Sequence, residues 1–280
     1  MKKVSLCTLG CRVNQSETRA IAELFVKQGY TVVEFGEECD VCVVNTCAVT
    51  AESERKSAQM IRRASRFAKD VRVCGCFAER KGLKLDNMPF VTQKVGCVGK
   101  TALADITPSL TEKGFELANI ATVPVEDVKV FSSARAFVKI QDGCAGKCTY
   151  CIIPSLRGPL RSRPPEDIVA EVKRLVAGGC KEIILTGIET AAYNYEPLYV
   201  LIERVSKIDG LKRIRLGSLD PNALSEGFIK TVASLPTVMP HFHISLQSGC
   251  DRILKLMRRP YTAADAKSRI DALKAAIPNV

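Results

Sequence analysis

Two stretches of the chain alternate short apolar runs with segments of helical period. The first stretch has strand-like runs at residues 3–9, 31–35, 41–46 and 71–75, and helical patterns at 15–28 and 50–68. Strands that alternate with helices favour a parallel sheet covered by helices on both faces. We therefore expect a small, doubly wound α/β domain over residues 1–106.

The second stretch repeats the alternation without a break that would reverse the sheet. Strand-like runs stand at residues 137–141, 182–187, 213–217 and 242–247, and helical patterns at 166–177, 197–208, 222–234, 250–257 and 262–277. Consecutive βα units predict a (β/α) barrel or part of one over residues 135–280. The last helix ends where another strand is due, so we expect a truncated, incomplete barrel.

Between these stretches, residues 107–134 contain Pro108, Gly114 and Pro124 among weak strand patterns, and we interpret them as a connector. No apolar run is long enough to cross a membrane, and the start "MKKVSLCTLG" lacks the apolar core of a signal peptide. We therefore expect a cytoplasmic protein without a membrane partner.

The chain is basic and rich in cysteine. It has 41 Lys and Arg against 30 Asp and Glu, a formal net charge of +11, which favours a polyanionic partner such as RNA. Its 13 cysteines are odd in number and lie in a long chain without a signal peptide. Reduced thiols that hold metal are therefore a better interpretation than a disulfide scaffold.

Three cysteines stand close together in "GCAGKCTYC", residues 143–151. Cys144, Cys148 and Cys151 follow the first strand of the second stretch, at the strand end where α/β barrels build active sites. A closed zinc site needs four ligands, and no fourth Cys or His lies within the loop. Three thiolates on a 4Fe-4S cluster would leave one iron open to a small molecule.

This C-x3-C-x2-C loop resembles that of the radical S-adenosylmethionine superfamily. The resemblance implies that Cys144, Cys148 and Cys151 hold a catalytic 4Fe-4S cluster whose open iron chelates S-adenosylmethionine, which the reduced cluster cleaves to a 5′-deoxyadenosyl radical. Tyr150 fits the family pattern and, with Gly187 in "LTGIET", is a candidate cofactor contact. Glu189 stands where members of the family often have His, Asn or Gln.

A second trio lies in the first stretch. Cys11, Cys47 and Cys76 each fall just after a predicted strand, at the carboxyl edge where doubly wound sheets bind ligands. The three thiols could converge there, although buried cysteines at strand ends are also common as small apolar residues. The residues alone leave both interpretations open.

Four segments, "GCRVNQSE", "NTCAVTAESERKS", "GCFAER" and "KIQDGCAGKCTYCIIPSLRGPLRSR", together resemble the methylthiotransferase branch of the superfamily. The resemblance implies a second 4Fe-4S cluster on Cys11, Cys47 and Cys76 that holds the sulfur to be methylated. It also implies two molecules of S-adenosylmethionine, a low-potential electron donor, a sulfur source and a C-terminal RNA-binding β-domain that this chain lacks. The reaction it implies inserts a methylthio group at a C–H bond.

Further segments, including "RLGSLDP" and "PHFHISLQSGCDRILKLMRRPYT", are most similar to the type that modifies N6-threonylcarbamoyladenosine 37 at C2 in the tRNA anticodon stem-loop. The isopentenyladenosine type and the type acting on a ribosomal-protein aspartate remain alternatives. From Gly143 to Pro165 the chain has no acidic residue, and its basic side chains are candidate RNA contacts: Lys147, Arg157, Arg161 and Arg163. A solvated basic loop is the alternative.

Other features are given less weight. Gly99, Lys100 and Thr101 imitate the end of a phosphate-binding loop, but Lys94 stands where that pattern requires glycine. The remaining cysteines are predicted to pack in the core: Cys7, Cys39, Cys42, Cys74, Cys97, Cys180 and Cys250. Two rivals of another class are a zinc-stabilised RNA-binding protein and an electron-transfer iron–sulfur protein.

Overall fold

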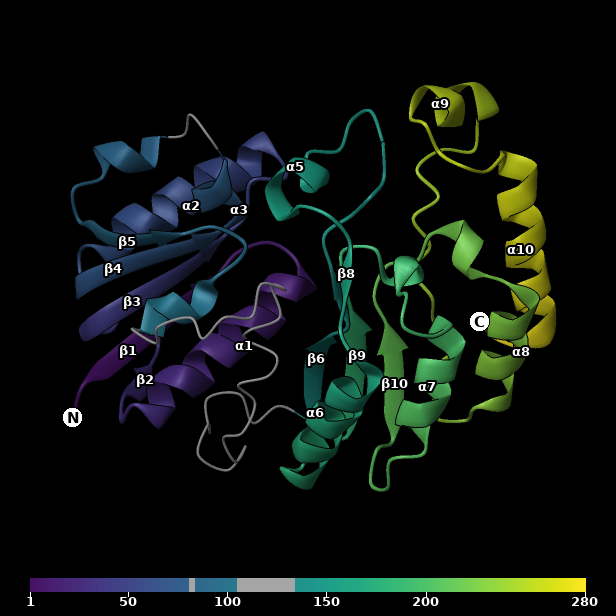
Figure 1. The fold of residues 1–280 in the computed structure, drawn as a ribbon, viewed down its shortest axis with the longest axis horizontal. Helices are drawn as coiled ribbons and strands as arrows, with labels where there is room; N and C mark the ends of the chain where they lie inside the picture. The colour runs from purple at the N-terminus through teal and green to yellow at the C-terminus, as the bar shows by residue number, and fades with distance from the viewer. Residues whose placement is uncertain (81–83, 105–133) are drawn as a thin grey trace. The chain divides into compact units, whose positions relative to one another are not determined.

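The computed structural model describes residues 1–80, 84–104 and 134–280, which form two compact units (Figure 1). The first unit comprises Met1–Ser132 with Ser155–Arg157, and the second comprises Ser133–Pro154 with Gly158–Val280. The predicted connector, residues 107–134, lies outside the described residues except for its last position.

The first unit contains one parallel sheet with the strand order β2-β1-β3-β4-β5. Its strands are β1 Lys3–Thr8, β2 Thr31–Val33, β3 Cys39–Thr46, β4 Ala68–Gly75 and β5 Val91–Val95. β5 was not expected from the sequence, because "VTQKV" is an edge strand in which three of five residues are polar. The doubly wound sheet that the sequence predicts is otherwise present.

Two helices cover this sheet from opposite faces (Figure 1). From β1, helix α1 (Arg12–Lys27) leads to β2 on one side, whereas from β3, helix α2 (Ala51–Ala64) leads to β4 on the other. Right-handed crossovers that run in opposite directions place their helices on opposite faces. The strand order therefore reverses between β1 and β3, and the carboxyl ends of these strands form the switch point where such sheets bind ligands.

Short helices complete the first unit: α3 Cys76–Glu79 and the 3-10 segments Lys84–Asn87 and Lys100–Ala104. The apolar face of α1 packs Ile21, Leu24 and Phe25 onto Val4 of β1 and Val43 of β3, all fully buried. This core anchors the strands whose ends carry the cysteines.

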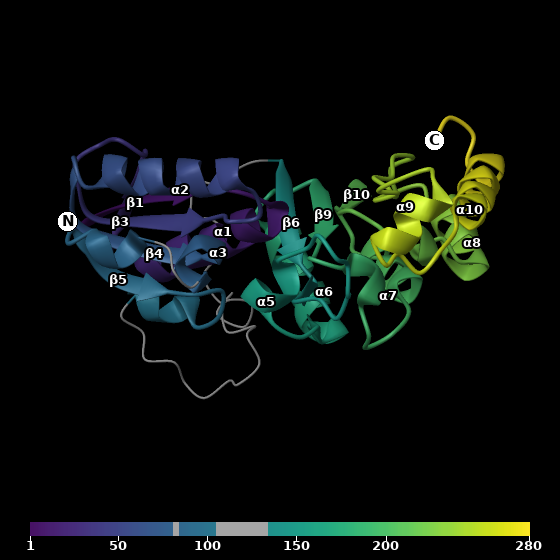
Figure 2. The ribbon, with the colours of Figure 1, turned by 90° about the horizontal axis from the view of Figure 1, so that it is seen from above.

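The second unit has a parallel sheet in the order β10-β9-β6 and a small antiparallel pair, β7 with β8. Its strands are β6 Arg135–Lys139, β7 Gln141–Asp142, β8 Arg161–Ser162, β9 Glu182–Thr186 and β10 Arg213–Leu216. Its helices are α5 Ile153–Arg157, of which Ser155–Arg157 belong to the first unit, α6 Pro165–Ala177, α7 Leu198–Ser206, α8 Glu226–Ser234, α9 Asp251–Leu256 and α10 Ala263–Ala276. Figure 2 shows α6 and α7 on the same side of the sheet, as successive right-handed βα units require.

The fourth strand predicted for this unit, residues 242–247, is reduced to one parallel bridge between Leu219 and Ile244. Two hydrogen bonds make the bridge, from the Leu219 N–H to the His243 carbonyl and from the Ser245 N–H to the Leu219 carbonyl. At Gln247 the backbone adopts φ +65°, which turns the chain away from the sheet direction. The prediction of a regular strand here was wrong.

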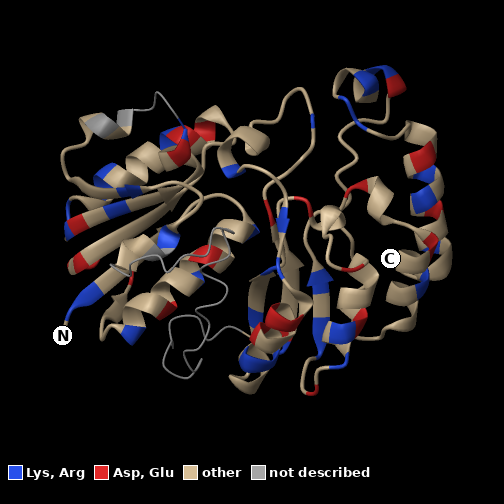
Figure 3. Ribbon diagram, in the orientation of Figure 1, with Lys and Arg blue, Asp and Glu red and all other residues tan. Residues whose placement is uncertain are grey.

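Basic and acidic positions are mixed along several elements, such as α2 and α10, and are not gathered on one of them (Figure 3). Among the described residues, no helix is both long and apolar enough to cross a membrane.

Candidate functional site

The structure brings the ends of three neighbouring strands, and the cysteines that follow them, to one edge of the first sheet. Thr8 of β1 pairs with Asn45 of β3, and Thr46 of β3 pairs with Gly75 of β4. Cys11, Cys47 and Cys76 therefore leave the sheet side by side at the switch point.

Side-chain hydrogen bonds connect the three cysteine-bearing turns. The Asn14 amide donates to the carbonyls of Leu9 (2.7 Å) and Thr46 (2.9 Å), and its oxygen lies 3.8 Å from the Cys11 Sγ. The Thr46 hydroxyl donates to the Cys74 carbonyl and accepts from the Phe77 N–H. Asn14 and Thr46 thus fix the positions of the first, second and third cysteines relative to one another.

Two glycines allow the turns to approach closely. Gly10 has φ +93°, and a Cβ built on it would lie 2.7 Å from the Cβ of Cys47. Gly75 has φ +92°, and its Cβ would lie 2.6 Å from the Thr46 carbonyl. Only glycine combines this backbone conformation with this closeness, so both residues belong to the architecture of the site.

A fourth thiol that the sequence reasoning assigned to core packing lies beside Cys76. Cys97, at the end of β5, has its Sγ 3.9 Å from that of Cys76, and its N–H donates to Glu79 Oε2 at 3.0 Å. The thiol of Cys97 hydrogen-bonds to Cys76 and lowers the pKa of Cys76 to about 6, while the pKa of Cys97 is raised. In the sequence, only its position just after a strand could have marked Cys97 as a site residue. That strand, β5, was not predicted.

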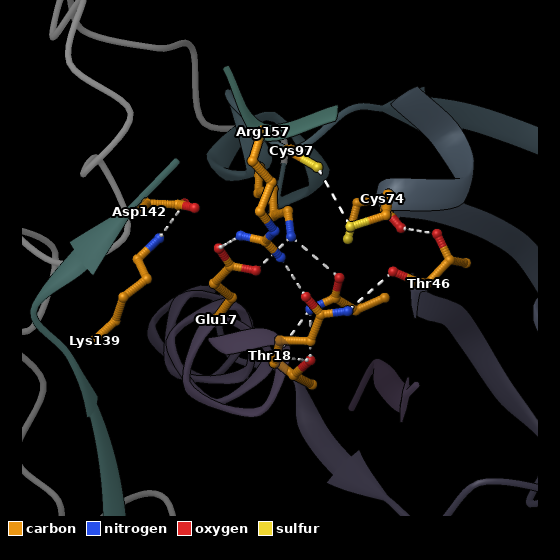
Figure 4. Close-up of polar contacts among 12 residues, drawn as sticks. Glu17, Thr18, Thr46, Cys74, Cys97, Lys139, Asp142 and Arg157 are labelled. Carbon is orange, nitrogen blue, oxygen red and sulfur yellow. Dashed lines mark hydrogen bonds and ion pairs between the residues drawn. The ribbon is translucent and has the colours of Figure 1, made fainter. Parts of the chain in front are cut away.

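Glu17, Lys100 and Arg157 are buried ionic side chains of the first unit, and Figure 4 shows Arg157 pointing toward Glu17. Glu17 accepts from Lys100 through Oε2 at 2.6 Å and from Arg157 through Oε1 at 3.3 Å. The exposed fraction of each of the three side chains is 1% or less. Arg157 also donates to the Asn14 oxygen at 2.5 Å, and Lys100 donates to that of Asn45 at 3.1 Å. From the sequence, Lys100 was given little weight, because it only imitates the end of a phosphate-binding loop. In the structure it is a central residue of the site.

The second trio is in the second unit, in the loop that follows β7. The Gly146 N–H donates to the Cys144 Sγ at 3.2 Å, and the Cys151 N–H donates to the Cys148 carbonyl at 3.2 Å. Gly143 has φ +69°, and a Cβ on it would lie 1.9 Å from the Pro159 carbonyl. The loop is therefore tightly folded, with all three thiols half-buried.

Residues from the end of α9 hold the far side of this loop. The Arg259 guanidinium donates to the Cys148 Sγ at 3.3 Å and forms an ion pair with Asp220. The Thr149 hydroxyl donates to the Leu256 carbonyl at 2.9 Å. Sequence reasoning missed Arg259 because it stands more than a hundred positions after the cysteines.

A cavity of about 400 Å³ opens beside the loop. It is lined by residues that include Gly146, Cys148, Glu189, Asp220 and Arg259. Burial and the nearby charge of Asp220 raise the pKa of Glu189, whose Oε2 lies 3.8 Å from the Cys144 Sγ. The cavity presents both signs of charge and one cysteine, Cys148, which suits a small zwitterionic ligand.

The two predicted cofactor contacts differ in their surroundings. Tyr150 is 51% exposed. Gly187 follows β9, where a Cβ would lie 2.8 Å from the Gln141 Oε1 and 3.1 Å from the Gln141 carbonyl oxygen, so a side chain here would displace Gln141.

The four candidate RNA contacts differ in how far their side chains are exposed to solvent. Lys147 is exposed and Arg161 half-buried, whereas Arg157 and Arg163 are each 1% exposed. Arg163 donates to Glu171 Oε2 at 2.6 Å. Buried, ion-paired guanidinium groups do not reach an RNA phosphate, so the prediction was wrong for Arg157 and Arg163.

The other cysteines are mostly buried, as predicted for Cys39, Cys42, Cys74 and Cys180. Cys7 is half-buried, and Cys250 is exposed at the start of α9, so core packing was wrong for Cys250.

The donor sets fit clusters better than single ions. Within residues 1–80, 84–104 and 134–280, no three His, Cys, Asp or Glu side chains are close enough to share one metal ion. A 4Fe-4S cluster instead binds each thiolate through a different iron, so its cysteines stand further apart than the ligands of zinc. A Cβ built on Gly146 would lie 3.1 Å from the Cys144 Sγ and 3.9 Å from the Cys148 Sγ, and one built on Gly10 would lie 2.9 Å from the Cys47 Sγ, so each trio has a glycine that leaves space beside its sulfurs.

Two protein-family models match this chain, one within each of the two units. The Radical SAM superfamily model matches residues 138–280, and the model described as Uncharacterized protein family UPF0004 matches residues 3–102. Among solved structures, the radical S-adenosylmethionine methyltransferase TsrM from Kitasatospora setae superposes with a TM-score of 0.66 at 13% identity, covering 99% of this chain and 66% of that one. This likeness concerns the fold.

Relatives at higher identity match along the chain. Threonylcarbamoyladenosine tRNA methylthiotransferase MtaB of Bacillus subtilis (strain 168) is 36% identical over 100% of this chain and 65% of its own length. The tRNA-2-methylthio-N(6)-dimethylallyladenosine synthase of Hydrogenobaculum sp. (strain Y04AAS1) is 34% identical over 99% of this chain and 68% of its own length. The chain thus spans about two thirds of these relatives. On these matches, it belongs to the radical SAM superfamily and, within it, to the methylthiotransferase family.

Proposed function

We propose that the protein acts as a tRNA methylthiotransferase, with S-adenosylmethionine and two 4Fe-4S clusters, and that its substrate is N6-threonylcarbamoyladenosine 37 in the anticodon stem-loop. The observation that carries the proposal is the presence of two separate cysteine trios, one after parallel strands β1, β3 and β4 of the first sheet and one in the loop that follows the short antiparallel strand β7. A zinc-stabilised RNA-binding protein would have no use for a second three-thiol site beside a ligand-sized cavity.

Each trio would hold one cluster: Cys144, Cys148 and Cys151 in the second unit, and Cys11, Cys47 and Cys76 in the first. When bound, the former supplies the electron that cleaves S-adenosylmethionine, and the latter supplies an iron for the sulfur to be transferred. The residues of the chain orient these groups. Arg259 fixes Cys148 and borders the cavity, so it and Glu189 are placed to meet the carboxylate and ammonium of the ligand.

Of the basic residues, Lys147 and Arg161 remain the proposed RNA contacts. Lys147 lies between two cysteines of the loop and lines the cavity, so a phosphate that it binds would place RNA next to the reacting atoms. The electron donor and the sulfur source are partners of the proposed reaction, which we place in the cytoplasm.

The test is anaerobic purification with counts of iron, sulfide and zinc per chain. We expect iron for two clusters, a spectral change on adding S-adenosylmethionine, and release of 5′-deoxyadenosine. Cys148→Ala should lose one cluster and the response to S-adenosylmethionine, whereas the matched control Cys250→Ala, at an exposed cysteine, should lose neither. Zinc without iron would contradict the proposal, and iron without any response would favour the electron-transfer rival.

The substrate is tested by mass analysis of nucleosides from tRNA of cells with and without the protein. Relatives of two substrate types match at 36% and 34% identity, so the 2-methylthio derivatives of both threonylcarbamoyladenosine and dimethylallyladenosine are measured. Loss of only the former supports the assignment. Loss of only the latter, or of neither, overturns it.

A further inference from the structure

Helix α9 of the second unit has one face packed inward and one face in solvent. Leu254 is buried in a small apolar cluster, whereas Arg252, Lys255 and Leu256 are exposed. Positions three and four residues apart lie on the same face of a helix, so these three side chains share one outward face. Leu256 is 61% exposed, which is unusual for a large apolar side chain among the described residues.

The two cations of this face lack an acidic partner. Within the part of the chain that the structure describes, neither Arg252 nor Lys255 forms an ion pair or a side-chain hydrogen bond. The exposed Lys207 of α7, in contrast, pairs with Glu203 at 2.8 Å. The acidic residue of α9, Asp251, accepts from the first N–H of α10 at 2.7 Å. Its carboxylate is thus directed away from the outward face.

The helix dipole explains only one of the two cations. Lys255 lies in the last turn, where a positive charge stabilises the helix. Arg252 lies in the first turn, where a positive charge is unfavourable. The stability of the helix therefore does not account for Arg252, whereas an anionic partner on the outward face would.

The outward face continues to the mouth of the cavity beside the cysteine loop. The Leu256 carbonyl accepts from the Thr149 hydroxyl at 2.9 Å, which joins the end of α9 to that loop. Arg258, just beyond the helix, and Lys147, in the loop, are exposed and line the cavity together with Cys148. Neither cation has an ion-pair partner among the described residues. Four cations without a partner thus extend from the cavity along α9.

We propose that this α9 surface binds the single-stranded RNA that flanks the target nucleotide. Its members are Lys147, Arg252, Lys255, Leu256 and Arg258. The inference rests on the proposed function. Lysine and arginine side chains bind phosphates, and an exposed apolar side chain can contact bases that are not stacked in a duplex. A strand held along α9 leads its next nucleotide into the cavity that the cysteine loop borders.

The test measures how tightly the iron-loaded chain binds a fluorescent RNA hairpin with the sequence of an anticodon stem-loop. Fluorescence anisotropy is recorded over a series of salt concentrations. The double variant Arg252→Gln/Lys255→Gln should bind roughly tenfold more weakly at low salt. Each phosphate contact with a single strand contributes about 0.7 to the slope of log affinity against log salt, so this slope should fall by about 1.4.

Two further double variants serve as controls. Arg252→Lys/Lys255→Arg keeps both charges and should bind the hairpin as the native chain does. Lys207→Gln/Lys267→Gln removes two exposed cations from α7 and α10, which pair with carboxylates of their own helices, and should change neither the affinity nor the salt slope.

Leu256→Ser tests the apolar part of the surface. It should weaken binding of the hairpin, whose loop bases are unpaired, and leave binding of a fully paired RNA duplex of the same length unchanged. An equal effect on both RNAs would overturn the assignment to single-stranded RNA.

The variants Arg252→Gln/Lys255→Gln and Leu256→Ser leave the residues that line the cavity intact, so both should keep the iron content and the spectral response to S-adenosylmethionine. Unchanged RNA affinity in the first variant would overturn the inference while the proposed function stands. Polyglutamate that displaces the hairpin as readily as unlabelled hairpin does would assign the surface to an acidic protein and also overturn it. A native chain without iron would overturn the proposed function, and the inference with it.

Discussion

The guanidinium of Arg259 donates a hydrogen bond to the Sγ of Cys148 across 3.3 Å, although 111 positions separate the two residues. The same guanidinium pairs with Asp220, and the exposed fractions of these two side chains are 9% and 12%. Arg259 therefore links the cysteine loop to the cavity wall and to the end of α9.

Arg259→Met should loosen this loop, because it leaves the nearly buried Asp220 without its cation. We expect a local loss of about 2 to 3 kcal/mol. The measurement is amide hydrogen exchange over residues 144–151 and 254–261. Arg258→Met, at the exposed neighbouring position, is the matched control, and equal exchange in the two variants would contradict the prediction.

Gly75→Ala should disturb the first cysteine site, whereas Gly29→Ala should not. Both glycines have positive φ, +92° and +81°, but a Cβ at Gly75 meets the Thr46 carbonyl while a Cβ at Gly29 meets nothing within 4 Å. Gly29→Ala should cost about 1 kcal/mol from backbone strain alone, and Gly75→Ala about 3 kcal/mol. Chemical denaturation measures both, and iron content should fall only in Gly75→Ala.

Thr46→Val should weaken the link between the second and third cysteine turns. Valine has nearly the same shape as threonine, but it leaves the Cys74 carbonyl and the Phe77 N–H without the hydroxyl that they share. We expect a loss of about 1 to 3 kcal/mol and a lower iron content after reconstitution. Thr46→Ser keeps the hydroxyl and should recover most of the stability and of the iron content. If Thr46→Ser is as unstable and as poor in iron as Thr46→Val, the role of Thr46 is packing and not hydrogen bonding.

Glu182 should make the stability of the protein depend on acid pH. Burial works to raise its pKa, but the hydrogen bond from Arg213 and the charges of Arg135 and Arg215 outweigh burial and lower it. A lowered folded-state pKa contributes stability above the ordinary value of 4.5, which is lost as the pH falls through the lowered pKa.

Glu182→Gln should therefore cost about 1 to 2 kcal/mol at neutral pH, a figure moderated by the partial exposure of the arginines. Thermal unfolding between pH 3 and 7 measures this loss of stability. The difference in stability between Glu182→Gln and the wild type should become smaller as the pH falls. Glu203→Gln, at an exposed ion pair, should show no such difference. A difference that stays constant with pH would contradict the prediction.

The sequence predicted the sheet of the first unit well because its inner strands are nearly continuous apolar runs, as in "VCVVNT". It failed at β5, where an edge strand needs few apolar residues, and at residues 242–247, where an apolar run forms a single bridge. The local pattern of apolar and polar residues indicates which side chains are buried. It does not indicate how many neighbouring strands a segment pairs with.

At the sites, the spacing of the cysteines was readable, but their ionic surroundings were not. Arg157 looked like an RNA contact because it stands in a basic segment, yet it pairs with Glu17, 140 positions earlier. Lys100 and Arg259 are likewise joined to their partners by the fold alone. Contacts between residues so far apart leave no mark on the local pattern of either segment.

The distance along the chain between Glu17 and Arg157 also orders the assembly of the first unit. During synthesis from the N-terminus, Glu17 and Lys100 emerge first. Arg157 follows only when the ribosome has passed residue 157. A nascent chain that stops before this point holds all three cysteines of the first trio but lacks the guanidinium that donates to Glu17 and to the Asn14 oxygen beside Cys11.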